Sequence, residues 1–183
     1  MRADPVAPLD GVTRILCYGV TGSGKTTLAA RIADVTGLPW QEADALTWEP
    51  GWVQVPTEEQ RRRVSALVAE ERWVLDTAYG SWTDLVLPRA ELVIALDYPR
   101  WVSLGRLLRR TALRLVDRRE VCNGNVEDLG NLLSSNSIVR WHFQSFRRKH
   151  ARIVAWEENP SGPDVLRFRS PRETEAWLAR AGR

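Results

Sequence analysis

Short apolar runs alternate with amphipathic stretches along most of the chain, which predicts strands and helices in turn. Continuous apolar runs at 14–18, 73–75 and 92–96 are typical of strands buried on both faces of a parallel sheet. Weaker signals predict further strands at 39–43 and 165–169. Because helices are predicted between these strands, we expect an α/β fold with a parallel sheet that is covered on both faces.

The predicted helices combine apolar positions at helical spacing with recognisable end signals. One helix begins near Lys25 and ends at Gly37, whose backbone can adopt the left-handed conformation of a helix end. A second runs from 57 to about 72 and opens with a capping box, Thr57 followed by Gln60. Further helices are predicted after Pro99, over about 138–150 and after Ser170.

The chain has the size and composition of one folded domain. Its 183 residues are 44% hydrophobic and 27% charged, so it can bury a core without disulfide bonds. Residues 1–12 form a polar arm without periodicity, and 13–183 are expected to be a single domain. Cys17 and Cys122 are too few for a disulfide framework or a four-cysteine zinc site. No signal or membrane-spanning segment is recognised, so a cytoplasmic protein with no membrane partner is expected.

Charge is unevenly distributed along the chain. The net charge is +3, yet residues 100–119 hold seven arginines and one acid, and residues 140–152 hold five basic residues and no acid. Such clusters indicate a local site for a polyanion, and phosphate is the obvious candidate. The 26 basic residues include only two lysines, Lys25 and Lys149. A site that keeps lysine in so arginine-rich a chain is therefore of particular interest.

The most specific motif is Gly19-Val20-Thr21-Gly22-Ser23-Gly24-Lys25-Thr26, between a predicted strand and a predicted helix. It matches the phosphate-loop pattern GxxxxGK[ST] in the required context. The glycines let backbone N–H groups turn around an anion, Lys25 neutralises the outer phosphates, and the Thr26 hydroxyl can ligate Mg²⁺. The sequence therefore predicts binding of a nucleoside triphosphate and Mg²⁺ by Gly19, Gly22, Ser23, Gly24, Lys25, Thr26 and Thr27.

Residues 13 to about 180 resemble the adenylate-kinase-like group of P-loop kinases, and more closely the branch described as DNA topology modulation proteins. Besides the phosphate loop, the resemblance rests on segments 44–52, 73–76 and 96–99, followed by Arg106 and Arg110. It implies a three-layer P-loop NTPase fold with a five-stranded parallel sheet of order 2-3-1-4-5. It also implies a small lid at about 111–137 and an acceptor-site region at about 44–72.

Two aspartates that end predicted strands could hold Mg²⁺ through water, Asp76 after 73–75 and Asp97 after 92–96. The resemblance favours Asp76, because it aligns with the aspartate that ends strand 3 in adenylate-kinase-like enzymes. Asp97 aligns with a turn residue before Pro99, so its alternative role is that of a turn or helix-entry carboxylate.

The helix predicted after Pro99 has two sides of different character. Its apolar side consists of Trp101, Leu104, Leu108, Ala112 and Leu115, and its other side carries Arg106, Arg110 and Arg114. An exposed arginine face is one interpretation. In the other, Arg106 and Arg110 face the transferring phosphoryl group, because similar kinases place two arginines seven and eleven residues after this proline.

The polar stretch at 117–137 suits a mobile cover that excludes water when substrate binds. Beyond it, one of Arg140, Arg147 and Arg148 could close over the phosphates. Lids in some relatives bind zinc through four cysteines. Since this stretch contains only Cys122, no lid metal is expected.

The acceptor site is predicted from fewer signals. Asp44 follows strand 2 and, in similar small-molecule kinases, faces the acceptor, where a carboxylate can hold or deprotonate a hydroxyl. Adenylate kinases carry an arginine four residues after the strand-3 aspartate, but this chain has Gly80 there, which argues against AMP as acceptor. The aromatic residues nearby could wall the acceptor pocket or belong to the ordinary core: Trp48, Trp52, Tyr79 and Trp82.

The leading hypothesis is a Mg-ATP-dependent phosphotransferase that acts on a nucleoside monophosphate or a hydroxylated metabolite. Its candidate catalytic residues are Lys25, Arg106, Arg110 and Asp44, and its candidate metal ligands are Thr26 and Asp76. ATP is preferred to GTP because no guanine-reading Asn-Lys-x-Asp signature is present. One rival is an ATP-switched nucleic-acid-binding protein, which the two basic segments and a pI near 9.2 would support. Another is an ATPase whose acceptor is water.

Overall fold

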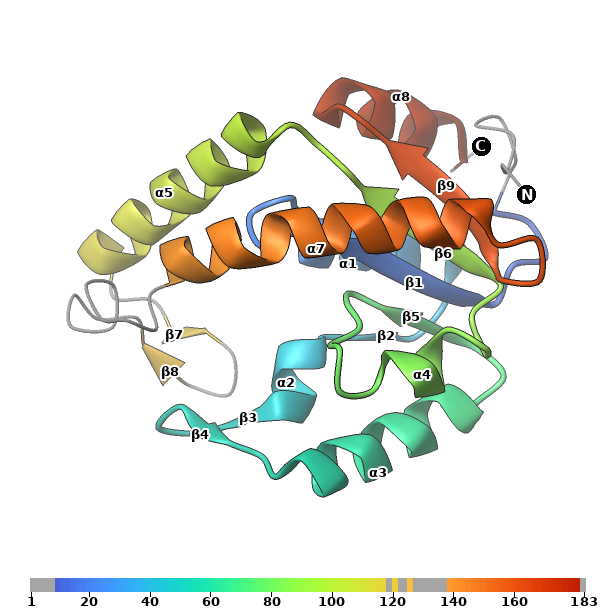
Figure 1. The fold of residues 1–183 in the computed structure, drawn as a ribbon, viewed down its shortest axis with the longest axis horizontal. Coiled ribbons are helices and arrows are strands. Elements are labelled where there is room, and N and C mark those ends of the chain that lie inside the picture. The colour runs from blue at the N-terminus through green and yellow to red at the C-terminus, as the bar shows by residue number, and fades with distance from the viewer. Residues whose placement is uncertain (1–8, 118–119, 122–124, 127–137, 182–183) are drawn as a thin grey trace.

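A five-stranded parallel sheet forms the centre of the molecule (Figure 1). A computed structural model describes residues 9–117, 120–121, 125–126 and 138–181. The strands of the sheet, in spatial order, are β2 (Trp40–Gln41), β5 (Trp73–Leu75), β1 (Arg14–Gly19), β6 (Leu92–Leu96) and β9 (Asp164–Phe168). In chain order these are strands 2-3-1-4-5, so the predicted fold class and strand order are confirmed.

The central strand β1 explains why the apolar runs are continuous. It pairs in parallel with β5 on one side, Ile15 opposite Val74, and with β6 on the other, Leu16 opposite Val93. The side chains of these strands are almost all buried, because helices cover both faces of a parallel sheet.

Seven helices accompany the sheet in the described ranges: α1 (Lys25–Thr36), α2 (Ala43–Thr47), α3 (Thr57–Ala69), α4 (Thr83–Val86), α5 (Arg100–Asp117), α7 (Ile138–Glu158) and α8 (Pro171–Ala181). One face of the sheet packs on α1 and α8, through residues such as Ile32 and Trp177. The other face packs on α3, α4 and α7, through residues such as Val64, Trp82 and Ile153. Helix α7 lies across the front of the sheet and α1 behind it (Figure 1).

Two short antiparallel hairpins complete the described structure. Strand β3 (Trp48–Glu49) pairs with β4 (Val53–Gln54), and β7 (Glu120–Val121) pairs with β8 (Asn125–Val126). The second hairpin belongs to the predicted lid at 111–137, most of which lies outside the described residues, as does Cys122. Residues 1–8 of the predicted arm also lie outside them. No helix in the described ranges is long and apolar enough to cross a membrane.

The predicted ends of α1 and α8 agree with the hydrogen bonds there. Gly37, with φ of 67°, ends α1 and donates its N–H to the carbonyl of Ala33. At the start of α8, the Ser170 hydroxyl accepts a hydrogen bond from the Glu173 N–H at 3.3 Å. The Glu173 carboxylate in turn accepts one from the Arg169 N–H at 2.8 Å.

Two local predictions, the capping box at Gln60 and the strand end at Ala43, were wrong because these residues form tertiary hydrogen bonds instead. Gln60 does not cap α3; its buried amide donates to the Val55 carbonyl and accepts a hydrogen bond from the Trp82 indole. The strand expected to reach Ala43 ends at Gln41, since Ala43 begins α2 and donates its N–H to Asp76 at 2.8 Å.

The apolar side of α5 is not the side that packs on the rest of the molecule. Trp101 is 76% exposed and Leu108 is 49% exposed, whereas the buried residues among the described side chains of this helix are Ser103, Leu107 and Thr111. This side of α5 packs on the phosphate loop, where a Cβ on Gly22 would meet the Ser103 carbonyl oxygen. Backbones approach this closely because Gly22 has no side chain.

Candidate active site

The phosphate loop connects β1 to α1 in a space that only glycine fits. A Cβ on Gly19 would lie 2.7 Å from the Leu96 carbonyl oxygen, and Gly22 is still more tightly enclosed by α5. Gly22 and Gly24 have φ of 82° and 98°, values that side-chain-bearing residues rarely adopt. The motif therefore has both the position and the backbone conformation that its sequence predicts.

Side chains from α5 and α7, the helices on either side of the predicted lid, donate hydrogen bonds to this loop. Three of its carbonyl groups, at alternate residues, accept hydrogen bonds: Gly19 from Lys149 Nζ at 2.8 Å, Thr21 from His142 Nδ1 at 3.1 Å, and Ser23 from Arg106 Nη1 at 3.1 Å. The loop amides are the groups that would bind a phosphate chain. Fixing the carbonyls of the same peptide units restricts how those amides can turn, so α5 and α7 help to preorganise the loop.

The residues that would hold Mg²⁺ meet at the start of α1. The Thr26 hydroxyl donates to Asp76 Oδ2 at 2.5 Å, and the second carboxylate oxygen of Asp76 accepts the Ala43 N–H at 2.8 Å. Asp76 is only 4% exposed. A hydroxyl and a carboxylate are the oxygen donors that Mg²⁺ prefers, and they lie beside the phosphate loop. The residues present therefore fit this ion.

Asp97, the competing aspartate, has a different environment. Its carboxylate accepts hydrogen bonds from Arg167 Nη2 at 2.7 Å and from His150 Nδ1 at 2.9 Å. Arg167 also donates to Glu157 at 2.8 Å. Asp97 thus belongs to an ion-pair cluster that joins the end of β6 to α7 and β9, a role different from the turn or helix-entry carboxylate considered for it.

Lys25, the lysine of the motif, lies among several charged groups. Burial lowers its pKa below the ordinary 10.5; the carboxylates of Asp76 and Asp44 oppose this shift, and the guanidinium of Arg110 adds to it. Its Nζ lies 3.4 Å from the Val20 carbonyl oxygen. The Lys25 ammonium group therefore lies within electrostatic reach of side chains from α2, from α5 and from the residue after β5.

The two predicted arginines of α5 both lie on the loop side of that helix. Arg106 donates to Ser23, lies 3.4 Å from the position of a Cβ on Gly24 and has its guanidinium 5.7 Å from the centre of the Tyr98 ring. Arg110 acts on the pKa of Lys25. The side chains of Arg114 and Arg140 lie outside the described structure.

Of the remaining predicted residues, Ser23 is buried and Thr27 is exposed in the first turn of α1. The four aromatic residues considered for the acceptor pocket pack against one another in pairs. Trp48 contacts Trp52 edge to face at 5.9 Å, and Tyr79 contacts Trp82 in the same way at 5.4 Å. Trp82 is fully buried, which favours a core role for this residue.

The predicted acceptor side lies where α2 and the segment after β5 approach α7. Asp44, in the first turn of α2, accepts a hydrogen bond from the Tyr79 hydroxyl. A Cβ on Gly80 would lie 3.1 Å from Arg152 Nη2, and Arg152 Nη1 donates to the Tyr18 hydroxyl at 3.4 Å. Gly80 occupies the position of an arginine in adenylate kinases. The guanidinium of Arg152, on α7, lies beside this glycine.

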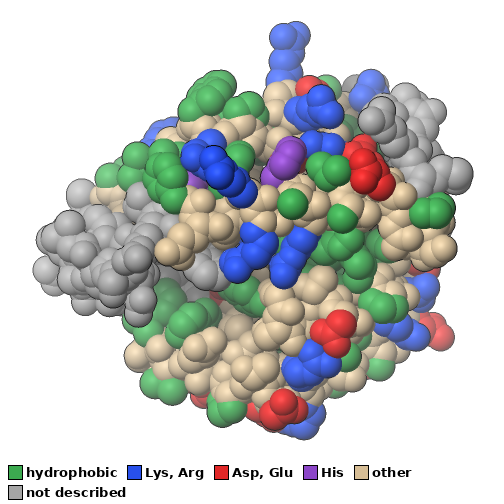
Figure 2. Space-filling model, viewed as in Figure 1, with side chains coloured by type: hydrophobic (Ala, Val, Ile, Leu, Met, Phe, Trp, Pro, Cys, Tyr) green, Lys and Arg blue, Asp and Glu red, His purple; other side chains and the backbone are tan. Residues whose placement is uncertain are grey.

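Sequence reasoning missed three site residues, all on α7: His142, Lys149 and Arg152. Figure 2 shows Lys and Arg side chains gathered near the middle of the face that α7 crosses. The charge of segment 140–152 pointed to this helix, and the rarity of lysine pointed to Lys149. No spacing rule connects these residues to a loop more than a hundred positions earlier in the chain.

No protein-family model matches the sequence, and neither does any curated protein. Solved structures match over nearly their whole length. A gluconokinase from Sinorhizobium meliloti is 18% identical with a TM-score of 0.51, and covers 93% of this chain and of its own. A shikimate kinase from Acinetobacter baumannii, in complex with shikimate, is 15% identical with a TM-score of 0.54, and covers 93% of this chain and 92% of its own.

A shikimate kinase from Bacteroides thetaiotaomicron is 13% identical with a TM-score of 0.55, covering 93% of this chain and 96% of its own. Identities this low speak to architecture alone. Together with the sheet order, they show that the chain has the α/β fold of these P-loop kinases.

Proposed function

We propose that this protein is a Mg-ATP-dependent kinase that transfers the terminal phosphoryl group of ATP to a hydroxyl group of a small acceptor. The observation that carries the proposal is the hydrogen bond between Thr26 and Asp76. It lies at the end of a phosphate loop whose glycines are closely packed by neighbouring backbone. A hydroxyl and a buried carboxylate joined at this point suit a Mg-nucleotide. The charged groups of α5 and α7 around the loop suit its phosphates.

Each side chain has a role that follows from its position. Lys25 and the loop amides bind the phosphate chain, and Arg106 and Arg110 neutralise charge on the moving phosphoryl group. Thr26 and Asp76 would hold Mg²⁺, which when bound neutralises phosphate charge. Phosphoryl transfer of this kind needs positioning and charge neutralisation rather than a covalent enzyme intermediate.

Asp44 is the proposed acceptor-side base. As the acceptor oxygen bonds to the terminal phosphorus, the bond from that phosphorus to the ADP oxygen breaks, and the hydroxyl proton passes to the Asp44 carboxylate. The hydrogen bond from the Tyr79 hydroxyl orients that carboxylate. Both groups lie on elements of the sheet's carboxyl edge rather than on the lid.

For the acceptor we favour a hydroxylated metabolite that carries an acid group over a nucleoside monophosphate. Arg152 beside Gly80 offers a cation to such a group. Two of the structures of similar fold are a gluconokinase and a shikimate kinase in complex with shikimate. Adenylate kinases clamp a monophosphate with an arginine at the position that Gly80 occupies here. This chain therefore lacks that clamp.

The test is a screen for ADP release by the purified protein with Mg-ATP and single candidate acceptors, hydroxylated carboxylic acids in one set and nucleoside monophosphates in the other. Asp44→Asn should lower turnover of the best acceptor about a hundredfold. Asp34→Asn, which changes an exposed aspartate of α1, is the matched control and should leave turnover unchanged.

The same screen separates a kinase from an ATPase, and a DNA-binding measurement tests the nucleic-acid-binding alternative. If no acceptor raises ADP release above the rate measured in buffer alone, the protein acts as an ATPase and the kinase proposal is contradicted. DNA binding that ATP changes, and that falls steeply between low and moderate salt, would favour the nucleic-acid-binding alternative and its resemblance to DNA topology modulation proteins.

A further inference from the structure

Lys149 is buried at the phosphate loop although it comes from the far end of the chain. It is 9% exposed in α7, and its Nζ donates to the Gly19 carbonyl oxygen at 2.8 Å and lies 5.2 Å from the centre of the Tyr18 ring. Lys25, the other lysine of the sequence, has its Nζ at the carbonyl of the next loop residue, Val20. The two lysines therefore approach consecutive carbonyls at the start of the loop.

The charges around Lys149 are mostly of its own sign. Burial lowers its pKa well below 10.5, and the nearby cations lower it further. The groups that act on it are Lys25 from α1, Asp44 from α2, and Arg152 and Arg148 from α7. Of these only the Asp44 carboxylate opposes the shift, and in the described residues Lys149 forms no ion pair with it.

A hydrogen bond to a carbonyl does not explain a charge at this position. A neutral amide side chain could donate to Gly19 without the cost of burying an ammonium group beside other cations. The observed arrangement is unfavourable for the protein alone and becomes favourable when a polyanion lies against both ammonium groups. A compact ammonium on a flexible stem suits a narrow space between loop and helix better than a guanidinium does.

We propose that Lys149 is a second phosphate-binding lysine, whose ammonium group faces the terminal phosphoryl group of a bound triphosphate together with that of Lys25. This inference rests on the proposed function, because it requires Mg-ATP in the phosphate loop. The Asp44 carboxylate, on the proposed acceptor side, lies within electrostatic reach of Lys149. Lys149 would therefore neutralise charge on the group that moves between the two substrates.

Three variants test this role. Lys149→Gln keeps a hydrogen-bond donor for Gly19 but removes the charge, Lys149→Met removes both, and Arg172→Met removes an exposed cation from α8 as control. Calorimetry should measure the dissociation constants of a Mg-bound non-hydrolysable ATP analogue and of Mg-ADP. We expect both Lys149 variants to lose about tenfold or more in affinity for the ATP analogue, with a smaller loss for ADP, which lacks the terminal phosphate.

The melting temperature without nucleotide separates phosphate binding from a structural role. We expect it to stay the same or rise in Lys149→Gln, because a buried cation beside other cations has been removed. Wild-type affinity for the ATP analogue in Lys149→Gln, or equal losses for the ATP analogue and ADP, would overturn the inference while leaving the kinase proposal intact. If the wild-type protein binds neither nucleotide, both proposals are wrong.

Discussion

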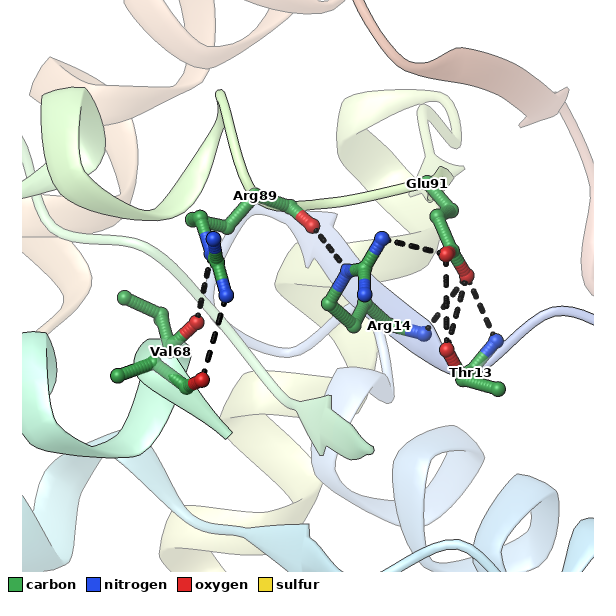
Figure 3. Close-up of polar contacts among 6 residues, drawn as sticks. Thr13, Arg14, Val68, Arg89 and Glu91 are labelled. Atoms are coloured by element: carbon green, nitrogen blue, oxygen red, sulfur yellow. Dashed lines mark hydrogen bonds and ion pairs between the residues drawn. The ribbon is translucent and has the colours of Figure 1, made fainter. Parts of the chain in front are cut away.

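At the edge of the sheet where its strands begin, charges meet opposite charges (Figure 3). The Glu91 carboxylate accepts hydrogen bonds from the backbone N–H groups of Thr13 and Arg14, at 2.7 and 3.1 Å, and from the Arg14 guanidinium at 2.6 Å. Arg14 also donates to the Arg89 carbonyl, and Arg89 donates to the Val68 carbonyl at the end of α3. This network ties β1, the start of β6 and α3 together.

At the opposite edge, where the strands end, Asp97 is paired with Arg167, but cations gather at the phosphate loop around Asp76 and Asp44. Lys25 and Lys149 donate to neutral carbonyls, and guanidinium groups from α5 and α7 lie within electrostatic reach of them. Charges arranged in this way oppose folding and favour an anion. Paired charges thus stabilise the edge where the strands begin, and the proposed binding of an anion belongs to the edge where they end.

The largest effect that would sharpen this contrast is expected from Lys25→Met. Loss of the lysine of the phosphate loop should lower ADP release about a hundredfold or more, because the cation that neutralises the outer phosphates is gone. Removal of a partly buried cation that lies near Arg110 and Lys149 should leave the melting temperature of the nucleotide-free protein unchanged or higher. Steady-state kinetics and thermal melting check both parts. A variant with full activity would contradict the site assignment.

At the other edge, Glu91→Ala should lower the free energy of unfolding by about 2 kcal/mol, since it removes charge-assisted hydrogen bonds from Thr13 and from Arg14, the first residue of β1. Its affinity for Mg-ATP should equal that of the wild type. Urea unfolding and nucleotide titration measure the two quantities. The control is Glu175→Ala, which breaks an exposed ion pair with Arg31 and should lower the free energy of unfolding by less than about 1 kcal/mol. A large loss of nucleotide affinity in Glu91→Ala would show that the two edges of the sheet do not act separately.

The smallest effect is a dependence on pH. Burial would raise the pKa of Glu91, but hydrogen bonds from Thr13 and Arg14 and the charge of Arg14 together outweigh it, so the pKa lies below its ordinary value of 4.5. The unfolded chain then takes up this proton first as the pH falls. The stability that Glu91 provides is therefore complete above about pH 5 and is lost as the pH falls through the lower, folded-state pKa.

The difference in unfolding free energy between wild type and Glu91→Gln should accordingly shrink from pH 7 to about pH 3. Urea unfolding at both values measures it. A difference that grows on acidification would show that the carboxylate is not stabilised in the folded protein.

The sheet and the phosphate loop could be predicted because their signals are local. Apolar runs such as 92–96 mark strands buried on both faces, and the glycines of the loop are required by its own backbone. The contact between Thr26 and Asp76 followed from the resemblance, which supplied the strand order.

The remaining contacts depend on tertiary structure that no local pattern encodes. The sequence pattern of α5 separated an apolar side from a basic side, but it did not show that Ser103 would be buried against Gly22 while Trp101 is exposed. Lys149 reaches Gly19 from α7, which follows the predicted lid. The basic character of segment 140–152 and the rarity of lysine in this chain hinted at Lys149, but neither identified its contact.

Helix α7 contacts both the loop, through His142 and Lys149, and the space beside Gly80, through Arg152. A substitution of Arg152 that shifts α7 would therefore also disturb the hydrogen bonds that this helix makes to the phosphate loop. Under the proposed function, acceptor selectivity and turnover would be coupled through this one helix. Directed evolution toward a new acceptor should then accumulate compensating changes along α7 as well as beside Gly80.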